Sequence, residues 1–484
     1  MSIRSRLDAI VSSMVTVHPH EIPALLHSSS CFFFILSAYF VVLPLRDEGA
    51  ISLGLSNLPG LFIGSLVLTL IAAPVSSFIL SFPNLSKSKA LVMIHRFFSL
   101  SLVVFFILWR ESSAEILPSN SKESVSSSSQ LKEDVKNGTV RASSANSVGW
   151  GNHSWFYISV RTGLFLWVAL LNLVTISSTW TRIIDVMDNE SGARLFGFIG
   201  AGATLGQLFG SLFATGMAWL GPCMHDFVFG SIFLAFIVRK TDPNQSKNDE
   251  NTAATSKISS PETSTSSAQP QFWAILDGLR LILSSTYLLH VSLFLWLSAV
   301  ISSFFYFQKV NVIAGIVASS IGRRRLFAQI NSFIAVFILA GQLTLTGRIL
   351  TVAGVCVAIC SAPIVAFSNL IAVAVWPTFL VVAVCETLRK VVTYVVTRPG
   401  RELLFTVVSQ EEKYRAKVCI DVIIQRLGDA AAAGLFKLLF STLHGNISTV
   451  SLYALPVCLA WIVTAFYLGQ RQTQLAKFRT VSTS

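Results

Sequence analysis

Long runs without a charged residue constrain this chain more than any other feature. No Asp, Glu, Lys or Arg occurs in the ranges 50–86, 195–225, 281–308, 326–347, 349–385 and 438–470. A helix needs about 20 apolar residues to cross the hydrocarbon core of a bilayer. Since the mean hydropathy is +0.66 and 53% of the residues are hydrophobic, an ordinary soluble protein is excluded. The sequence therefore predicts an integral membrane protein that crosses the bilayer many times.

The spacing of these runs predicts an all-α membrane protein with twelve transmembrane helices in two halves of six. The expected helices are 30–47, 59–82, 90–109, 155–180, 194–219, 222–238, 285–308, 326–346, 349–367, 369–394, 417–442 and 449–469. The N-terminal half is expected at 1–238, the C-terminal half at 272–470 and a cytoplasmic tail at 471–484. Between the halves, 239–271 is rich in Ser, Thr, Asn and Pro, which predicts a flexible linker. The same composition predicts a long loop at 111–152.

Basic residues predict the orientation of the bundle. With the N-terminus in the cytoplasm, the cytoplasmic side collects Arg4, Arg6, Lys87, Lys89, Arg182, Arg239, Lys240, Arg348, Arg471, Lys477 and Arg479. This agrees with the excess of Lys and Arg that cytoplasmic loops carry, although the arginines at 323–325 fall on the other side. Both termini and the linker are therefore expected on one side, and the loop 111–152 on the opposite side.

Glycines recur every four residues in the fifth expected helix, at Gly202, Gly206 and Gly210. Small residues on one face let helix backbones approach closely, so we expect tight helix packing there. A nucleotide-binding glycine loop needs a preceding strand, and none is predicted. No nucleophile–base pair, metal motif or phosphate loop is visible elsewhere either, so we expect no catalytic residue, metal or cofactor.

Charged residues within or at the ends of the expected helices are the candidates for a substrate site. An ionisable side chain at membrane depth costs about 3 kcal/mol on insertion scales, so it either reaches the interface or faces a polar cavity. Arg46 and Asp47 end the first helix, Arg96 lies in the third and Arg161 in the fourth. Both interpretations remain open for these residues.

The eleventh expected helix carries a polar face. Asp421, Gln425 and Asp429 are spaced four apart and would share one side of a helix, with Arg426 next to Gln425. A lipid-facing stripe of this kind would be prohibitive. We expect this face to line a central cavity or to form an ion-pair network between helices.

The segment 398–417 concentrates charge immediately before that helix. A basic cluster at the mouth of a cavity can hold phosphate or carboxylate. Here Arg401 and Lys417 are expected to remain available to an anion, while the glutamates of the segment, among them Glu402, pair with neighbouring cations. The alternative is an ordinary positively charged cytoplasmic loop.

Three segments carry a family resemblance. They are "RPGRELLFTVVSQEEKYRAKVCIDVIIQRLGDAAAAGLF", "ARLFGFIGAGATLGQLFGSLF" and "YFVVLPLRDEGAISLG". They resemble the ATP/ADP translocase family of plastids and intracellular bacteria, a twelve-helix branch of the major facilitator type. The resemblance runs along nearly the whole chain except the two Ser-rich segments, and 398–429 is its most specific part.

The resemblance implies a secondary transporter that exchanges ATP for ADP by alternating access. The family pattern of a basic residue followed by Asp matches Arg46 and Asp47, although typical exchangers carry Lys at the first position. The pattern of Pro, a basic residue and Glu matches Pro399, Arg401 and Glu402, and the later Lys and Asp match Lys417 and Asp421.

One departure concerns the fourth helix, where typical exchangers carry an acidic residue and "LFLWVALLNLVTISSTW" has none. This leaves the substrate open. Other readings are a transporter of another organic anion, or a membrane scaffold or receptor that keeps the fold. The expected partners are a small anionic solute and the lipid bilayer, with no nucleic acid and a monomeric state. The resemblance implies a plastid envelope, while a plasma or internal membrane also stays open.

Overall fold

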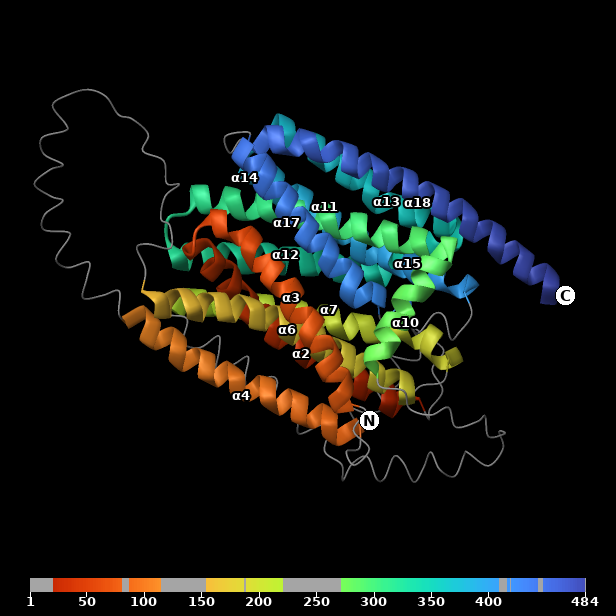
Figure 1. Ribbon diagram of the computed structural model, residues 1–484, viewed down its shortest axis with the longest axis horizontal. Coiled ribbons are helices and arrows are strands. Elements are labelled where there is room, and N and C mark those ends of the chain that lie inside the picture. The colour runs from red at the N-terminus through yellow and green to blue at the C-terminus, as the bar shows by residue number, and fades with distance from the viewer. Residues whose placement is uncertain are drawn as a thin grey trace, which may run out of the picture.

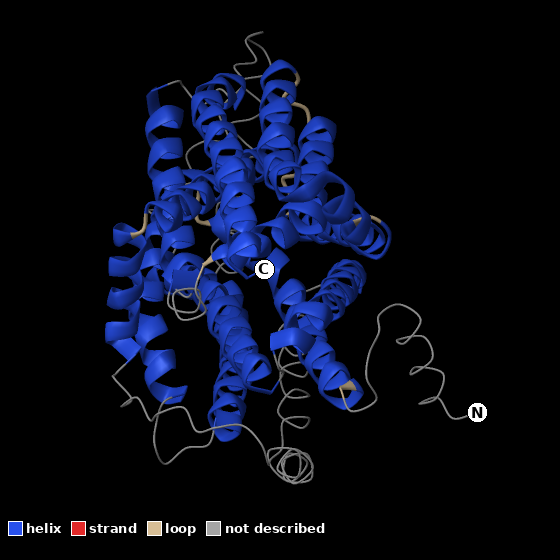
Figure 2. Ribbon diagram, turned by 90° about the vertical axis from the view of Figure 1, so that its right-hand side faces the viewer, coloured by secondary structure: helices blue, strands red, loops and turns tan. Residues whose placement is uncertain are grey.

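All regular elements in the described part of the chain are helices, as Figure 2 shows. The computed structural model describes residues 21–80, 87–114, 154–186, 189–220, 271–408, 416–417, 419–442 and 447–483. The all-α class predicted from the sequence is confirmed. The predicted helix 222–238, almost all of the linker 239–271 and the predicted loop at 111–152, except for its first residues, lie outside this part.

The N-terminal helices are α2 (Ile22–Ser52), α3 (Leu58–Leu80), α4 (Lys87–Ala114), α6 (Trp155–Val186) and α7 (Asn189–Leu220). The C-terminal helices are α10 (Gln271–Ser284), α11 (Thr286–Ile316), α12 (Ser320–Thr344), α13 (Thr346–Val375), α14 (Phe379–Val392), α15 (Arg398–Leu404), α17 (Gln425–Thr442) and α18 (Ile447–Thr483). Two π-helical turns, η3 (Thr393–Thr397) and η5 (Ile420–Ile424), precede α15 and α17. Short 3-10 turns lie at η1 (Leu55–Asn57) and η4 (Phe405–Val407).

Eight of the described helices are long and apolar enough to cross a membrane. Their outward faces carry large hydrophobic side chains that would be costly in water, such as Leu100, Phe97 and Val463, each more than half exposed. A lipid environment removes that cost, because hydrocarbon solvates these side chains. The chain is a multi-pass integral membrane protein.

The helices run along one axis, so each functional residue can be assigned to one of two ends (Figure 1). The loop end contains Ala114 and Trp155, which flank the predicted loop. The tail end contains Gln271, where α10 begins, and the C-terminus of the chain. Segments that flank the predicted loop and the predicted linker thus lie at opposite ends.

The helices pack within the N-terminal group and within the C-terminal group, and further helix contacts join the two groups. In the N-terminal group α2 packs against α6 and α7, and in the C-terminal group α13 packs against α18 and α11 against α17. The two groups meet where α7 packs on α12 and α3 on α17. Buried aromatic residues continue across this boundary, since Phe62 of α3 lies 4.9 Å from Phe307 of α11 between ring centroids.

The glycine face of α7 makes the close helix contact predicted for it. A Cβ added to Gly206 would lie 2.2 Å from the carbonyl oxygen of Phe33 in α2, and one added to Gly210 would lie 2.5 Å from that of Ser37. The hydroxyl of Ser37 also donates a hydrogen bond of 3.2 Å to the carbonyl oxygen of Gly206. The two backbones approach this closely because no side chain separates them.

Several predicted helix boundaries are wrong, and two of them change how the chain is divided. The break expected at residue 368 does not exist, because α13 continues to Val375 and the chain turns at Trp376 to Thr378 instead. Pro377 lacks an N–H and disfavours helical geometry at the residue before it, and Trp376 has φ −130° and ψ 84°. At the C-terminus, the helix expected to end at 469 continues as α18 to Thr483, so most of the predicted tail is helical.

Candidate functional site

The candidate site includes a salt bridge between two neighbouring residues near the loop end of α2. The guanidinium of Arg46 donates to the carboxylate of Asp47 from Nη2 at 2.6 Å and from Nε at 3.0 Å. The Asp47 side chain is only 2% exposed. Arg46 also lies over the ring of Phe165 in α6, with its guanidinium carbon 5.0 Å from the ring centroid.

A side chain from the C-terminal helices completes this pair. The hydroxyl of Tyr306 in α11 donates a hydrogen bond of 2.9 Å to Asp47. One helical turn further, Lys309 places its ammonium 5.4 Å from the Tyr306 ring centroid. Asp47 is therefore held by both helix groups at once.

Glu386 of α14 gathers three cations. Its carboxylate accepts from Nη2 of Arg389 at 2.6 Å, and lies 3.3 Å from the ammonium of Lys390 and 3.6 Å from that of Lys309. Glu386 is 2% exposed. Arg389 is fixed further by donating to the hydroxyl of Ser302 at 3.1 Å. One carboxylate thus serves three cations in a site shielded from solvent.

We call Arg46, Asp47, Tyr306, Lys309, Glu386, Arg389 and Lys390 the interface network. Among its charged members are four cations and two carboxylates, an excess of two positive charges. The buried members, Lys309, Arg389, Asp47 and Glu386, balance in charge. The excess therefore lies with Arg46 and Lys390, whose side chains are 13% and 24% exposed.

Asp429 forms a smaller polar group in the middle of the bundle. It accepts a hydrogen bond of 2.7 Å from the hydroxyl of Ser303 in α11, and Nη1 of Arg426 lies 3.4 Å from its other oxygen. The ion pair of Arg426 and Asp429 lies within α17, and the contact between helices is the hydrogen bond from Ser303. Asp421 has different neighbours, however, and Gln425 is exposed. The π-helical turn η5 contains Asp421 and interrupts the α-helical register, so the four-residue spacing does not gather all three on one site.

The charge-rich segment at the tail end forms ion pairs within the C-terminal helices. Arg401 donates to Asp421 at 2.6 Å, and Lys417 pairs with Glu402. Burial alone raises the pKa of Glu402, but the charges of Lys417 and Arg401 outweigh it and hold that pKa below its ordinary value. The two cations expected to remain available to an anion are thus paired with carboxylates in this structure.

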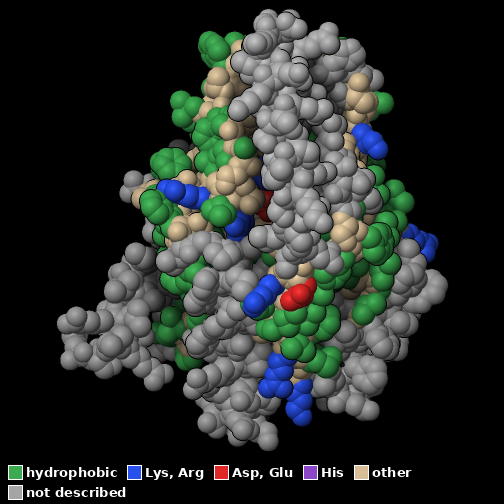
Figure 3. Space-filling view, turned by 90° about the vertical axis from the view of Figure 1, so that its left-hand side faces the viewer, with side chains coloured by type: hydrophobic (Ala, Val, Ile, Leu, Met, Phe, Trp, Pro, Cys, Tyr) green, Lys and Arg blue, Asp and Glu red, His purple; other side chains and the backbone are tan. Residues whose placement is uncertain are grey.

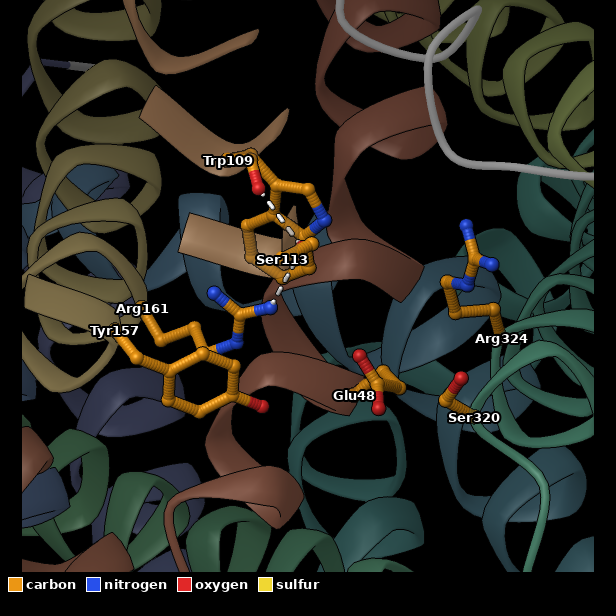
Figure 4. Close-up of a pocket in the computed structure, with 7 residues that line it drawn as sticks. All are labelled: Glu48, Trp109, Ser113, Tyr157, Arg161, Ser320 and Arg324. Atoms are coloured by element: carbon orange, nitrogen blue, oxygen red, sulfur yellow. Dashed lines mark hydrogen bonds between the residues drawn. The ribbon is translucent and has the colours of Figure 1, made fainter. Parts of the chain in front are cut away.

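The remaining predicted residues lie apart from the interface network. Arg96 is exposed on α4. Arg161, near the start of α6, lines a cavity of about 220 Å³ at the loop end instead (Figure 4). Basic and acidic side chains are both visible at this end among hydrophobic ones (Figure 3).

An ion pair next to that cavity joins the two helix groups. Nη2 of Arg323 in α12 lies 3.2 Å from the carboxylate of Glu48 in α2. Its neighbour Arg325 stacks on Trp219 of α7, with 3.9 Å between the guanidinium carbon and the ring centroid. Both contacts link N-terminal to C-terminal helices, so the loop end is closed along α2, α7 and α12.

Sequence reasoning missed Lys309, Glu386, Arg389 and Lys390. A signal was available, because Glu386, Arg389 and Lys390 lie in a predicted transmembrane helix with the i, i+3 and i+4 spacing that brings side chains together. Within the described residues, no cluster of His, Cys, Asp and Glu could hold a metal ion.

Comparisons with known proteins agree with this architecture. Residues 301–472 match the family described as TLC ATP/ADP transporter, so the resemblance to ATP/ADP translocases is confirmed over that part of the chain. No curated protein sequence matches.

Similar solved structures cover nearly the whole chain. The human organic anion transporter MFSD10 (TETRAN) has 14% sequence identity and a TM-score of 0.51, with 95% of this chain and 100% of that chain covered. The fucose:proton symporter FucP of E. coli has 13% identity and a TM-score of 0.50, with 93% and 99% covered. FucP in the outward conformation, described as a Major Facilitator Superfamily transporter, gives a TM-score of 0.52 at 13% identity and the same coverage. At these identities the likeness concerns the fold, which is that of a major facilitator.

Proposed function

We propose that this major-facilitator-type secondary transporter exchanges ATP for ADP by alternating access, with the interface network binding the phosphate groups. The excess of cations over carboxylates where α2, α11 and α14 meet carries the proposal. The family match at 301–472 supports a nucleotide as the anion, since it includes α14 and both network residues of α11, Tyr306 and Lys309.

The chemistry of the network suits phosphate. Arg46 and Arg389 present planar guanidinium groups that can bind phosphate oxygens in pairs, and Lys309 and Lys390 act as point charges. In the structure Arg46 pairs with Asp47, and the other three cations pair with Glu386. An arriving phosphate would compete with the two carboxylates and take over some of their partners, so substrate binding changes the contacts that join the helix groups.

The position of the network suits alternating access. The hydrogen bond between Tyr306 and Asp47 and the ion pair between Arg323 and Glu48 both connect α2 to C-terminal helices. For the loop end to open, both must break. A ligand that interacts with Asp47's partners therefore alters the free-energy difference between the closed and open arrangements.

Exchange in liposomes tests this function. Purified protein is reconstituted in vesicles loaded with ADP, and uptake of labelled ATP is measured against vesicles without internal nucleotide. We expect uptake that needs internal ADP and is lost in Lys309→Gln. The matched control is Lys437→Gln, because Lys437 is exposed on α17 and should not change exchange.

Other outcomes identify the alternatives. Exchange of a different organic anion, with none for ATP or ADP, would show that the fold carries another substrate. Absence of flux with every nucleotide, phosphate and organic acid, from a correctly folded protein, would favour a scaffold or receptor.

A further inference from the structure

We propose that the loop-end cavity is an oxyanion site, separate from the interface network, that binds one phosphate group between Arg161 and Arg324. None of the residues that line the cavity belongs to the network. This inference goes beyond the proposed function, because it does not depend on which anion the network carries.

The first observation is that the buried side chain of Arg324 lacks a polar or aromatic partner among the described residues. It lines the cavity and is 6% exposed, yet its side chain makes no hydrogen bond, ion pair or aromatic contact with the residues that the structure describes. Both neighbours have partners, since Arg323 pairs with Glu48 and Arg325 stacks on Trp219. A guanidinium carries five N–H donors and stays charged, and no nitrogen of Arg324 is among the fully enclosed atoms without a partner, so its donors open onto the cavity. An oxyanion in the cavity would supply the missing acceptors.

The second observation is that neighbouring side chains hold the guanidinium of Arg161 in place. Its guanidinium is packed between two rings, 3.5 Å from the Tyr157 centroid and 4.0 Å from the Trp109 centroid. It donates to the hydroxyls of Ser112 at 3.0 Å and Ser113 at 3.3 Å. Figure 4 shows this group reaching toward the middle of the cavity, on the side opposite Arg324. A guanidinium fixed in this way loses little freedom when it binds an anion.

Charge and size restrict the ligand. Three arginines, at 161, 323 and 324, surround one carboxylate, Glu48, so the positive charge exceeds the negative. The cavity of about 220 Å³ is smaller than the roughly 300–1,000 Å³ typical of drug-sized ligands. A single phosphate group fits this space better than a whole nucleotide. Free inorganic phosphate and the terminal phosphate of a nucleotide offer the same chemistry.

The site also spans the two helix groups. Arg161 comes from α6 and Arg324 from α12, so a phosphate held by both would connect them beside the ion pair of Glu48 and Arg323. The bound anion should therefore stabilise the closed arrangement of the loop end.

Thermal stability of the full-length protein in lipid nanodiscs, titrated with inorganic phosphate, tests the site. We expect phosphate to raise the Tm of the wild type in a saturable way. Arg324→Gln should weaken apparent binding at least tenfold, whereas Arg325→Gln, which removes the same charge one residue away, should leave it unchanged. If Arg324→Gln does not fold, Arg324→Lys keeps the charge but loses the paired donors, and it should weaken binding as well.

Several results would overturn the proposal. These are no Tm increase with phosphate in the wild type, equal losses in the variants at 324 and 325, or an unchanged titration in both Arg324 variants. Lys309→Gln locates the bound phosphate independently, because it alters the interface network and not the cavity. If Lys309→Gln abolishes the phosphate response, the anion binds at the network and the cavity proposal is wrong.

Parallel titrations distinguish the two sources of phosphate. A larger Arg324-dependent response to ATP than to inorganic phosphate assigns the site to a nucleotide's terminal phosphate, and an equal or smaller one assigns it to free phosphate. Failure of ATP/ADP exchange in liposomes, with the phosphate response retained, would reject the proposed function and leave this site standing.

Discussion

The hydroxyl of Tyr306 donates a hydrogen bond of 2.9 Å to the carboxylate of Asp47, although the two residues are 259 positions apart in the chain. This contact joins α2 to α11 at the interface network. It makes the closed arrangement of the helices depend on a group that also holds a candidate substrate-binding cation, Arg46.

Tyr306→Phe removes this donor and keeps the ring. Hydrogen bonds to charged groups contribute about 1.5–3 kcal/mol, so we expect a lower Tm together with an altered exchange rate. The control is Tyr287→Phe, which removes a hydrogen bond of 2.8 Å to the carbonyl oxygen of Leu404 within the C-terminal helices and should lower the Tm alone. Equal exchange rates in wild type and both variants would show that the hydrogen bond to Asp47 has no role in transport.

Glu386→Gln leaves three cations without their carboxylate. Removing one partner of a buried ion pair costs about 3–5 kcal/mol, so the yield of folded protein should fall sharply. Adding Lys309→Gln to this variant removes part of the repulsion and should restore some folded protein, as judged by size-exclusion chromatography. Glu402→Gln is the control, because Glu402 is 44% exposed and should change the yield little. A Glu386→Gln protein as stable as wild type would contradict the burial argument.

Gly206→Ala tests the close contact of α7 with α2. The new Cβ would lie 2.2 Å from the carbonyl oxygen of Phe33, and the forced displacement should cost about 1–3 kcal/mol. Gly216→Ala on the same helix meets nothing within 4 Å and should stabilise, since Ala favours a helix by about 1 kcal/mol over Gly. Opposite shifts in Tm are expected, and shifts of the same sign would refute the packing role.

Asp429→Asn and Asp421→Asn test two polar groups, one in the middle of the bundle and one at the tail end. Asp429 pairs with Arg426 and accepts from Ser303, whereas Asp421 pairs with Arg401. We expect each variant to reduce exchange more than it reduces the amount of folded protein, measured in the same vesicles. Normal flux in both would place these carboxylates outside the transport pathway.

Acid should weaken the ion pair of Glu402 and Lys417. Because the pKa of Glu402 lies below its ordinary value of 4.5, the pair stabilises the protein fully above that value and is lost as pH falls through the lower folded-state pKa. Thermal unfolding of wild type and Glu402→Gln, compared between neutral pH and pH below 4.5, should show a difference that shrinks on acidification. A difference that grows instead would mean that the pKa is raised.

The sequence by itself determined the membrane class, most of the helices and the tight packing at the glycines of α7, but not that α2 is the partner. Each of these depends on local composition or spacing, because a bilayer sets the length of an apolar run and a four-residue repeat of glycine marks one side of a helix. The family resemblance also came from local motifs, and its match covers residues 301–472.

Only the tertiary structure decided which charges meet. Lys309 and Glu386 share a site because α11 and α14 are placed at matching depth and rotation, and neither quantity can be obtained from the spacing of residues on one helix. The π-helical turn at Ile420–Ile424 changes the register before Asp429, which is why one predicted polar face became two sites. Arg161 likewise faces a loop-end cavity, because its neighbours come from α2, α4 and α12. Pairing across helices is a property of their packing, and the packing is fixed by contacts made over the whole bundle.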